Sequence, residues 1–136
     1  MIRKALLSSA VACAAMAGVA LTAAPASASD SYHEMFTSDG GTAGGFMSFT
    51  EHGDVVLLGD NDADGKRLIL EVWVGSRIRY TLEASGVGVT DVGRASMGGA
   101  YNLPENTTIQ FIMYLYDASN GGATSGIVAQ DWYNDY

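Results

Sequence analysis

Residues 67–84, RLILEVWVGSRIRYTLEA, decide the fold. On both sides of Gly75-Ser76, apolar side chains occupy every second position, which is the period of a β-strand with one buried face. A glycine followed by a serine suits a two-residue hairpin turn. The stretch therefore predicts an antiparallel hairpin of strands 67–74 and 77–84. The side chains expected on its buried face are Leu68, Leu70, Val72, Val74, Ile78, Tyr80 and Leu82.

Further strands are expected on either side of this hairpin, at 46–50, 54–58, 87–92, 107–116 and 126–133. The strand at 107–116 has apolar residues on one face and a mixed set of Gln110, Ile112, Tyr114 and Tyr116 on the other, so we expect it to be central and covered on both sides. No stretch after residue 45 has an amphipathic helical period. The pattern predicts an all-β fold, a small antiparallel β-sandwich, with a small β-barrel as the alternative.

The N-terminal segment has the features of a secretory signal peptide. Arg3 and Lys4 precede an apolar stretch, and Ala26-Ser27-Ala28 matches an A-x-A cleavage site. We therefore expect residues 1–28 to be removed and the protein to be secreted to the extracellular space. Residues 29–45 are rich in glycine and are expected to form a flexible leader, which leaves 46–136 as the β-sandwich domain.

Charge and cysteine content exclude several classes of partner and site. Residues 29–136 contain five basic and fifteen acidic residues, a formal net charge of −10. Such a surface repels phosphate backbones and anionic lipids, so neither nucleic acid nor a membrane is expected as a partner. The one cysteine, Cys13, falls in the signal segment, so the domain holds no disulfide and no thiolate site. An extracellular polysaccharide or protein remains as the candidate partner.

One string has the spacing of a calcium-binding loop. Asp60, Asp62, Asp64 and Gly65, followed after five residues by Glu71, match D-x-[DN]-x-[DN]-G-x5-E. Alternating carboxylates on a tight turn can converge on a hard cation, and the glycine permits the bend. Asp60, Asp62 and Asp64 are therefore candidate calcium ligands, and calcium is the only cofactor that the sequence suggests.

The surroundings of this string are strands and not helices, which excludes an EF-hand. In an extended strand Glu71 lies about 20 Å beyond Gly65 and cannot reach the ion that Asp60 would bind. The alternative, which the strand context favours, is an Asx-type turn in which the Asp side chains accept hydrogen bonds from loop amides.

A family resemblance rests on some of the same residues. Gly53-Asp54, Asp60, Asp64-Gly65 and the segment LPENTTIQF at 103–111 resemble a group of small secreted actinobacterial β-rich proteins, which share an A-x-A signal, a G-[ED]…D-x-x-x-D-G hairpin and a final V-x-F-like strand. The resemblance implies a structural turn at 60–65 and carries no catalytic residue, because the group has no established activity. The group often has two cysteines near the last strands, and this sequence has none there.

No catalytic pattern is visible, so we do not expect an enzyme. His33 falls in the expected leader, and His52 falls in a turn between two acids. No G-x-S-x-G motif accompanies them. A small hydrolase centred on His52 is the enzymatic alternative.

Trp73 is the candidate ligand-binding residue. It shares a strand face with Ile69 and Glu71, and an aromatic ring beside a carboxylate can stack on a sugar and accept its hydroxyls. The alternative is that Trp73 and Ile69 cover a second core layer. We therefore expect a secreted, non-enzymatic binding or structural module. The other function to test is inhibition of an extracellular protease through the loop at 94–97.

Overall fold

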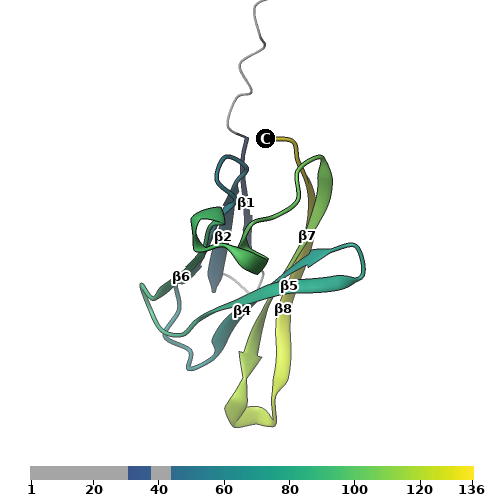
Figure 1. The fold of residues 1–136 in the computed structure, drawn as a ribbon. Helices are drawn as coiled ribbons and strands as arrows, with labels where there is room; N and C mark the ends of the chain where they lie inside the picture. The colour runs from purple at the N-terminus through teal and green to yellow at the C-terminus, as the bar shows by residue number, and fades with distance from the viewer. Residues whose placement is uncertain (1–30, 38–43) are drawn as a thin grey trace, which may run out of the picture.

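The computed structural model describes residues 31–37 and 44–136. These residues form two β-sheets that pack face to face (Figure 1). The strands are β1 (Tyr32–Phe36), β2 (Gly45–Thr50), β3 (Val55–Asp60), β4 (Arg67–Val74), β5 (Arg77–Ala84), β6 (Thr90–Gly93), β7 (Thr107–Asp117) and β8 (Ala123–Asn134). Short 3-10 turns are η1 (Ala95–Met97), η2 (Gly99–Tyr101) and η3 (Ala118–Asn120).

Some of the sequence predictions fall outside this part of the chain. The expected signal peptide, 1–28, and residues 38–43 of the glycine-rich segment are not among the described residues. Within 31–37 and 44–136, no helix has both the length and the apolar character needed to cross a membrane.

Each sheet has four antiparallel strands. One sheet has the order β1-β2-β3-β6, and the other has the order β5-β4-β7-β8. The two ends of each sheet are not joined, so the fold is the predicted β-sandwich and not a closed barrel. We call the second sheet the β4–β7 sheet, after its two central strands.

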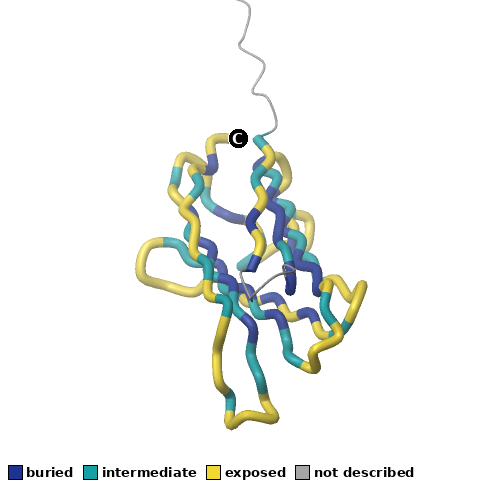
Figure 2. Tube along the Cα trace, turned by 180° about the vertical axis from the view of Figure 1, so that it is seen from behind, coloured by how far each residue is buried: buried dark blue, intermediate teal, exposed yellow. Residues whose placement is uncertain are grey.

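The core forms where the inner faces of the two sheets meet. Phe49 from β2 and Phe111 from β7 lie with ring centroids 5.0 Å apart, and both are fully buried. Burying a large apolar side chain contributes roughly 1.5–3 kcal/mol, so this alternating face is what holds the two layers together. Figure 2 shows the buried segments in the interior and the hairpin ends exposed. The largest buried side chains include Met47, Phe49, Leu58, Leu68, Leu70, Leu82, Ile109, Phe111, Met113 and Leu115.

The predicted hairpin is confirmed with the same bounds, β4 and β5, but one side chain lies on the other face. Val72 pairs with Tyr80, whereas Trp73 pairs with Ile78, so the register shifts by one residue between them. This β-bulge moves Ile78 off the core face, and the side chain is 46% exposed. The prediction that Ile78 faces inward is therefore wrong, while Tyr80 and Leu82 are buried as expected.

The prediction that residues 29–45 form a leader is wrong for 32–36. These residues form β1, which pairs along its whole length with β2, and Met35 is 5% exposed in the core. After β1, the Gly45 amide donates to the Thr37 hydroxyl at 2.9 Å. An edge strand can be held by backbone hydrogen bonds to one neighbour, so it needs few apolar side chains. The folded domain therefore includes β1 and does not begin at Phe46.

The other expected strands exist, with shifted ends. The largest shifts are in the strands expected at 87–92 and 126–133, which are Thr90–Gly93 and Ala123–Asn134. The strand at 107–117 is central, since β4 and β8 flank it, but its second face is half-buried, and no further layer of the described residues covers it. That half-buried face becomes the outer surface of the β4–β7 sheet.

One end of the sandwich is closed by a buried carboxylate. The side chain of Asp54 accepts hydrogen bonds from the Leu103 amide at 2.9 Å and from Asn134 Nδ2 at 3.1 Å. Asp54 and Asn134 are both buried. These bonds connect the turn before β3, the loop before β7 and the end of β8.

Candidate functional site

The outer face of the β4–β7 sheet is the candidate binding surface. Side chains that alternate with the core residues of β4 and β7 project from it, and cross-strand pairing places Ile69 beside Tyr114 and Trp73 beside Gln110. All four of these residues are half-buried. The face is therefore made of partly exposed rings and polar groups with no layer of this domain above it in the described part of the chain.

Glu71 lies at the centre of this face and holds two aromatic side chains. The Trp73 indole Nε1 donates to Glu71 Oε2 at 2.9 Å, and the Tyr114 hydroxyl donates to Glu71 Oε1 at 3.0 Å. Each carboxylate oxygen has a second lone pair, so Glu71 can still accept a hydrogen bond from a ligand. Burial, together with the hydrogen bond to Glu71, raises the pKa of the Tyr114 phenol, so that the hydroxyl stays a donor at neutral pH. The three side chains form a fixed group, the Trp73–Glu71–Tyr114 cluster.

A second group, centred on Arg67, lies at one end of the same face. The Arg67 Nη1 lies 2.9 Å from Glu83 Oε1, and its guanidinium carbon lies 5.2 Å from the centre of the Tyr116 ring. The hydrogen bond and charge of Glu83 raise the pKa of Arg67. Because this ion pair is exposed, it contributes little to stability. With Ile69 and Tyr114, these residues line a shallow hollow of about 250 Å³.

The far end of the face carries an amide and a carboxylate. Gln110 Nε2 donates to Asp131 Oδ1 at 3.0 Å, and these residues face each other across β7 and β8. The face therefore presents aromatic rings, a guanidinium and several carboxyl and amide oxygens along one sheet.

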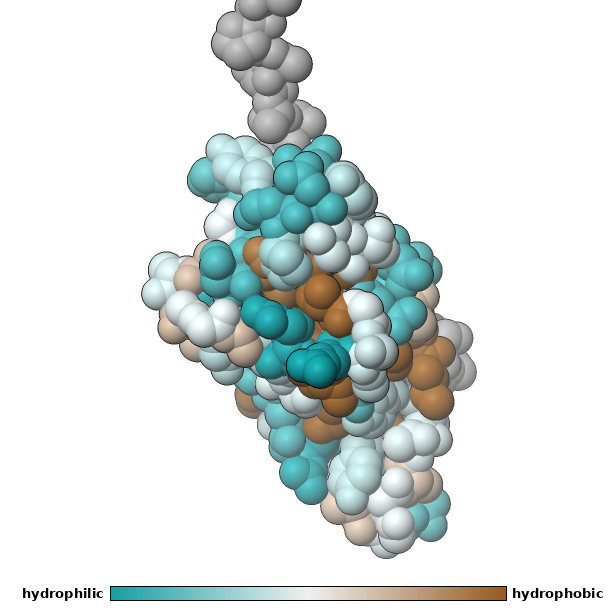
Figure 3. Space-filling model, turned by 45° about the vertical axis from the view of Figure 1, so that its right-hand side comes forward, coloured by the Kyte–Doolittle hydropathy of each residue, from teal (hydrophilic) through white to brown (hydrophobic). Residues whose placement is uncertain are grey.

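This combination suits a ligand with an apolar side and many hydroxyl groups. Aromatic side chains offer a flat apolar surface with a polar edge, and carboxylates and amides accept or donate hydrogen bonds in fixed directions. Figure 3 shows the side toward which the β4–β5 hairpin projects in Figure 1, where apolar side chains lie directly against strongly hydrophilic ones. The aromatic and polar groups are spread along the sheet, which suits stacking and hydrogen bonding to an extended ligand.

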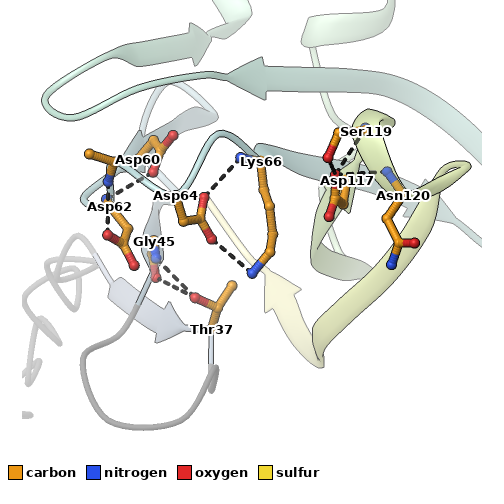
Figure 4. A network of polar contacts seen from close by, with 10 residues as sticks. Thr37, Gly45, Asp60, Asp62, Asp64, Lys66, Asp117, Ser119 and Asn120 are labelled. Atoms are coloured by element: carbon orange, nitrogen blue, oxygen red, sulfur yellow. Dashed lines mark hydrogen bonds and ion pairs between the residues drawn. The ribbon is translucent and has the colours of Figure 1, made fainter.

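The predicted calcium ligands lie on one loop, and each binds a neighbouring group of the protein (Figure 4). Asp60 is buried; its Oδ1 accepts from the Asp62 amide at 3.0 Å, and its Oδ2 accepts from the Gly86 amide at 2.6 Å. Asp64 accepts from the Lys66 amide at 2.9 Å and forms an ion pair with Lys66 Nζ at 2.8 Å. These contacts are those of an Asx-type turn.

The three carboxylates of this loop are not brought together. Gly65 has φ of 76°, the left-handed conformation that the turn requires. Among the residues that the structure describes, no three His, Cys, Asp or Glu side chains are grouped so that they could hold a metal ion. Calcium binding by Asp60, Asp62 and Asp64 stays a prediction, and the observed contacts give each carboxylate a structural role.

The two histidines lie in different structural settings. His33 is on β1, where its Nε2 lies 2.9 Å from Glu51 Oε1 and its ring stacks on Trp132 at 4.9 Å. His52 is exposed in the turn between β2 and β3, and its ring meets that of Tyr136 at 4.1 Å. Within 31–37 and 44–136, neither histidine is hydrogen-bonded to a serine or threonine hydroxyl.

Residues 94–97, the loop proposed for protease inhibition, contain a tight 3-10 turn. Residues 95–97 form η1, in which the Met97 amide donates to the Arg94 carbonyl at 2.9 Å. Met97 is 53% exposed, and Gly98 and Gly99 follow with positive φ. The loop is a compact turn and not an extended segment that could add as a strand to a partner.

Sequence reasoning placed Trp73 and Glu71 on one face but missed the residues that complete the surface. Tyr114 and Tyr116 were expected on the second face of a strand covered on both sides, and their contacts with β4 depend on which strands pair. Both strands show the same alternation of core and outer residues. This alternation identifies the residues that share the outer face only once β4 is known to lie beside β7.

Comparison with protein-family models, with curated proteins and with solved structures gives no match. The resemblance to the small secreted actinobacterial proteins therefore stays a prediction, and the function has to be argued from the residues.

Proposed function

We propose that this protein is a secreted, non-catalytic module that binds an extracellular polysaccharide through the outer face of the β4–β7 sheet. The observation that carries the proposal is the Trp73–Glu71–Tyr114 cluster, a partly exposed indole held in place by a carboxylate that keeps free acceptor capacity. A sugar ring has an apolar C–H face that can lie on the indole, while its hydroxyls can donate to Glu71.

The rest of the surface supports an extended ligand. The row from Arg67 and Tyr116 through the cluster to Gln110 and Asp131 follows β4 and β7 for most of their length. Such a row can contact successive sugar units. An extended contact surface with many weak hydrogen bonds is typical of binding without catalysis.

The position of Trp73 also distinguishes this proposal from a second core layer. Core residues of the same strand, such as Leu70 and Val72, are fully buried, whereas Trp73 is only half-buried. Its polar atom is bonded to a side chain on the outer face and not to the backbone of another layer.

The test is retention of the purified protein on a panel of insoluble polysaccharides, including cellulose, chitin and xylan. We expect retention on at least one of them, loss of that retention in Trp73→Ala, and weaker retention in Glu71→Gln. Tyr32→Ala is the matched control, since Tyr32 is a 58% exposed aromatic residue on the other sheet.

Unfolding midpoints show whether each variant is folded. Retention on none of the polysaccharides, or equal loss of retention in Trp73→Ala and Tyr32→Ala, would contradict the proposal.

A further inference from the structure

The β-bulge in β5 turns an arginine away from the outer face of the sheet. The register shift leaves Arg79 without a partner across the ladder and pairs Arg77 with Val74. Val74 packs against the core, and cross-strand partners project from the same face of a sheet. Arg77 therefore lies on the inner side of the β4–β5 hairpin, opposite to where uninterrupted alternation would place it.

Both arginines line one hollow. It has a volume of about 440 Å³ and lies between the β4–β5 hairpin and the turn η2, which packs beside β5. Volumes of roughly 300–1,000 Å³ are typical of small-molecule sites. The guanidinium of Arg79 reaches toward the loop after η2, where its Nη2 lies 3.4 Å from the Asn102 carbonyl oxygen. The lining residues are Val74, Arg77, Ile78, Arg79 and Ala100.

The charges in this hollow are not neutralised by the protein. Lys66 and Arg67 each form an ion pair, with Asp64 and Glu83. In the part of the chain that the structure describes, no carboxylate lies within ion-pair distance of Arg77 or Arg79.

Residues 29–136 hold three times as many acidic as basic residues, so two arginines without a carboxylate partner are unusual here. Arg77 and Arg79 line the same hollow, and each guanidinium offers a fork of N–H donors that matches an oxyanion.

We infer that this hollow binds a small ligand that joins one oxyanion group, a carboxylate or a phosphate, to a short apolar group. Arg77 and Arg79 would bind the oxyanion, and the side chains of Val74, Ile78 and Ala100 provide the apolar contact. The net charge of −10 repels long polyanions, so the ligand is small. The inference does not rest on the proposed polysaccharide surface, because none of the five residues that line the hollow belongs to the Trp73–Glu71–Tyr114 cluster.

The bulge supports this inference because it exposes an apolar side chain to water. Ile78 is 46% exposed, although it would be buried if the alternation continued. Bulges that re-aim a side chain are common next to binding sites, and here the re-aimed side chain is an arginine.

The test is titration of the purified protein with four matched probes, followed by calorimetry or by backbone amide NMR shifts. Hexanoate and hexyl phosphate carry both required groups, acetate carries only the anion, and 1-hexanol carries only the apolar chain. We expect saturable binding of hexanoate, hexyl phosphate or both, and at least about tenfold weaker binding of acetate and 1-hexanol. The probe that binds more tightly identifies the oxyanion.

Substitutions locate the site. Arg77→Gln and Arg79→Gln should each weaken binding about tenfold, which is the loss expected for one charge-assisted hydrogen bond. Arg94→Gln is the control, because Arg94 is also exposed and has no ion pair within 31–37 and 44–136. The polysaccharide assay depends on Trp73 and this titration depends on Arg77 and Arg79, so failure of one proposal is distinguishable from failure of the other. Lack of saturable binding by both anionic probes, or equal weakening in Arg94→Gln, would overturn the inference.

Discussion

Asp54 connects three segments that are distant in the sequence, and replacing it tests whether these connections close the sandwich. The carboxylate accepts from the Leu103 amide and from Asn134 Nδ2, residues 49 and 80 positions away. It is 2% exposed, so water cannot replace the lost contacts. Asp54→Ala leaves the Leu103 amide buried without this acceptor, and it leaves Asn134 Nδ2 with only the Pro104 carbonyl oxygen, 3.3 Å away.

The expected loss can be worked from these contacts. A hydrogen bond to a charged group contributes about 1.5–3 kcal/mol, and Asp54 makes two. Its φ is +51°, a conformation that Asp tolerates and in which Ala costs about 1 kcal/mol. We therefore expect Asp54→Ala to lower the free energy of unfolding by about 4 kcal/mol or more, a large part of the roughly 5–15 kcal/mol of a small domain.

A milder variant keeps the test informative if Asp54→Ala does not fold. Asp54→Asn retains one oxygen acceptor and the preference for positive φ, but its new amide faces one of the two donors that the carboxylate accepted from. We expect a loss of about 1–2 kcal/mol. The control is Asp135→Ala, because Asp135 is exposed.

The measurement is urea unfolding followed by tryptophan fluorescence and far-ultraviolet circular dichroism. The slope with urea should stay constant while the midpoint falls in the order wild type, Asp54→Asn, Asp54→Ala. A loss below about 1 kcal/mol in Asp54→Ala, similar to that in Asp135→Ala, would refute the argument that these bonds close the domain.

Three further predictions concern the bulge, a buried phenol and the aspartate loop. Ile78→Thr should change the free energy of unfolding by less than about 0.5 kcal/mol, whereas Leu82→Ala should cost about 2–5 kcal/mol; similar losses in urea unfolding would contradict the observed register. Burial raises the pKa of Tyr80, and Asp54 adds to the shift. The contribution of the neutral Tyr80 phenol to the free energy of unfolding should therefore be fully present below pH 10 and should be lost as the pH rises above it. In Tyr80→Phe the free energy of unfolding should fall less steeply over the same range. At pH 7, Tyr80→Phe should unfold at the same temperature or higher, because its buried hydroxyl has no partner; a clearly lower midpoint would count against this. Added calcium should leave the melting temperature unchanged, since the loop carboxylates already bind protein groups; a rise that Asp62→Asn abolishes would instead establish the calcium site.

The sequence predicted those parts of the fold that depend on local alternation. Residues 67–84 gave both strands and the turn with their observed ends, because one face of each strand is buried and the pattern of every second residue records it. The same rule failed at Ile78, because a bulge inserts one residue without leaving a mark in the pattern. It also failed at β1, a five-residue strand beside a glycine-rich segment, which pairs with β2 along its whole length.

The candidate site was predictable only in part, for a related reason. Alternation put Trp73 and Glu71 on one face, but it cannot say which strand lies next to β4 or in what register. The contacts of Glu71 with Tyr114 and of Arg67 with Tyr116 join residues more than 40 positions apart, and both follow from the pairing of β4 with β7. The hollow at Arg77 and Arg79 depends on the bulge, so no local pattern could have predicted it.

The central claim, that the Trp73 face binds sugar, can be tested most directly through the two indole N–H signals of the protein. Trp73 and Trp132 are its only tryptophans; Trp73 lies on the outer face, and Trp132 stacks on His33 and packs at a tilt against Phe111. The measurement is a titration of nitrogen-15-labelled protein with soluble oligosaccharides of the polysaccharide that retains it. The account predicts a saturable shift of the Trp73 indole signal and none of the Trp132 signal. A shift of Trp132 alone, or binding that leaves the Trp73 signal in place, would contradict it.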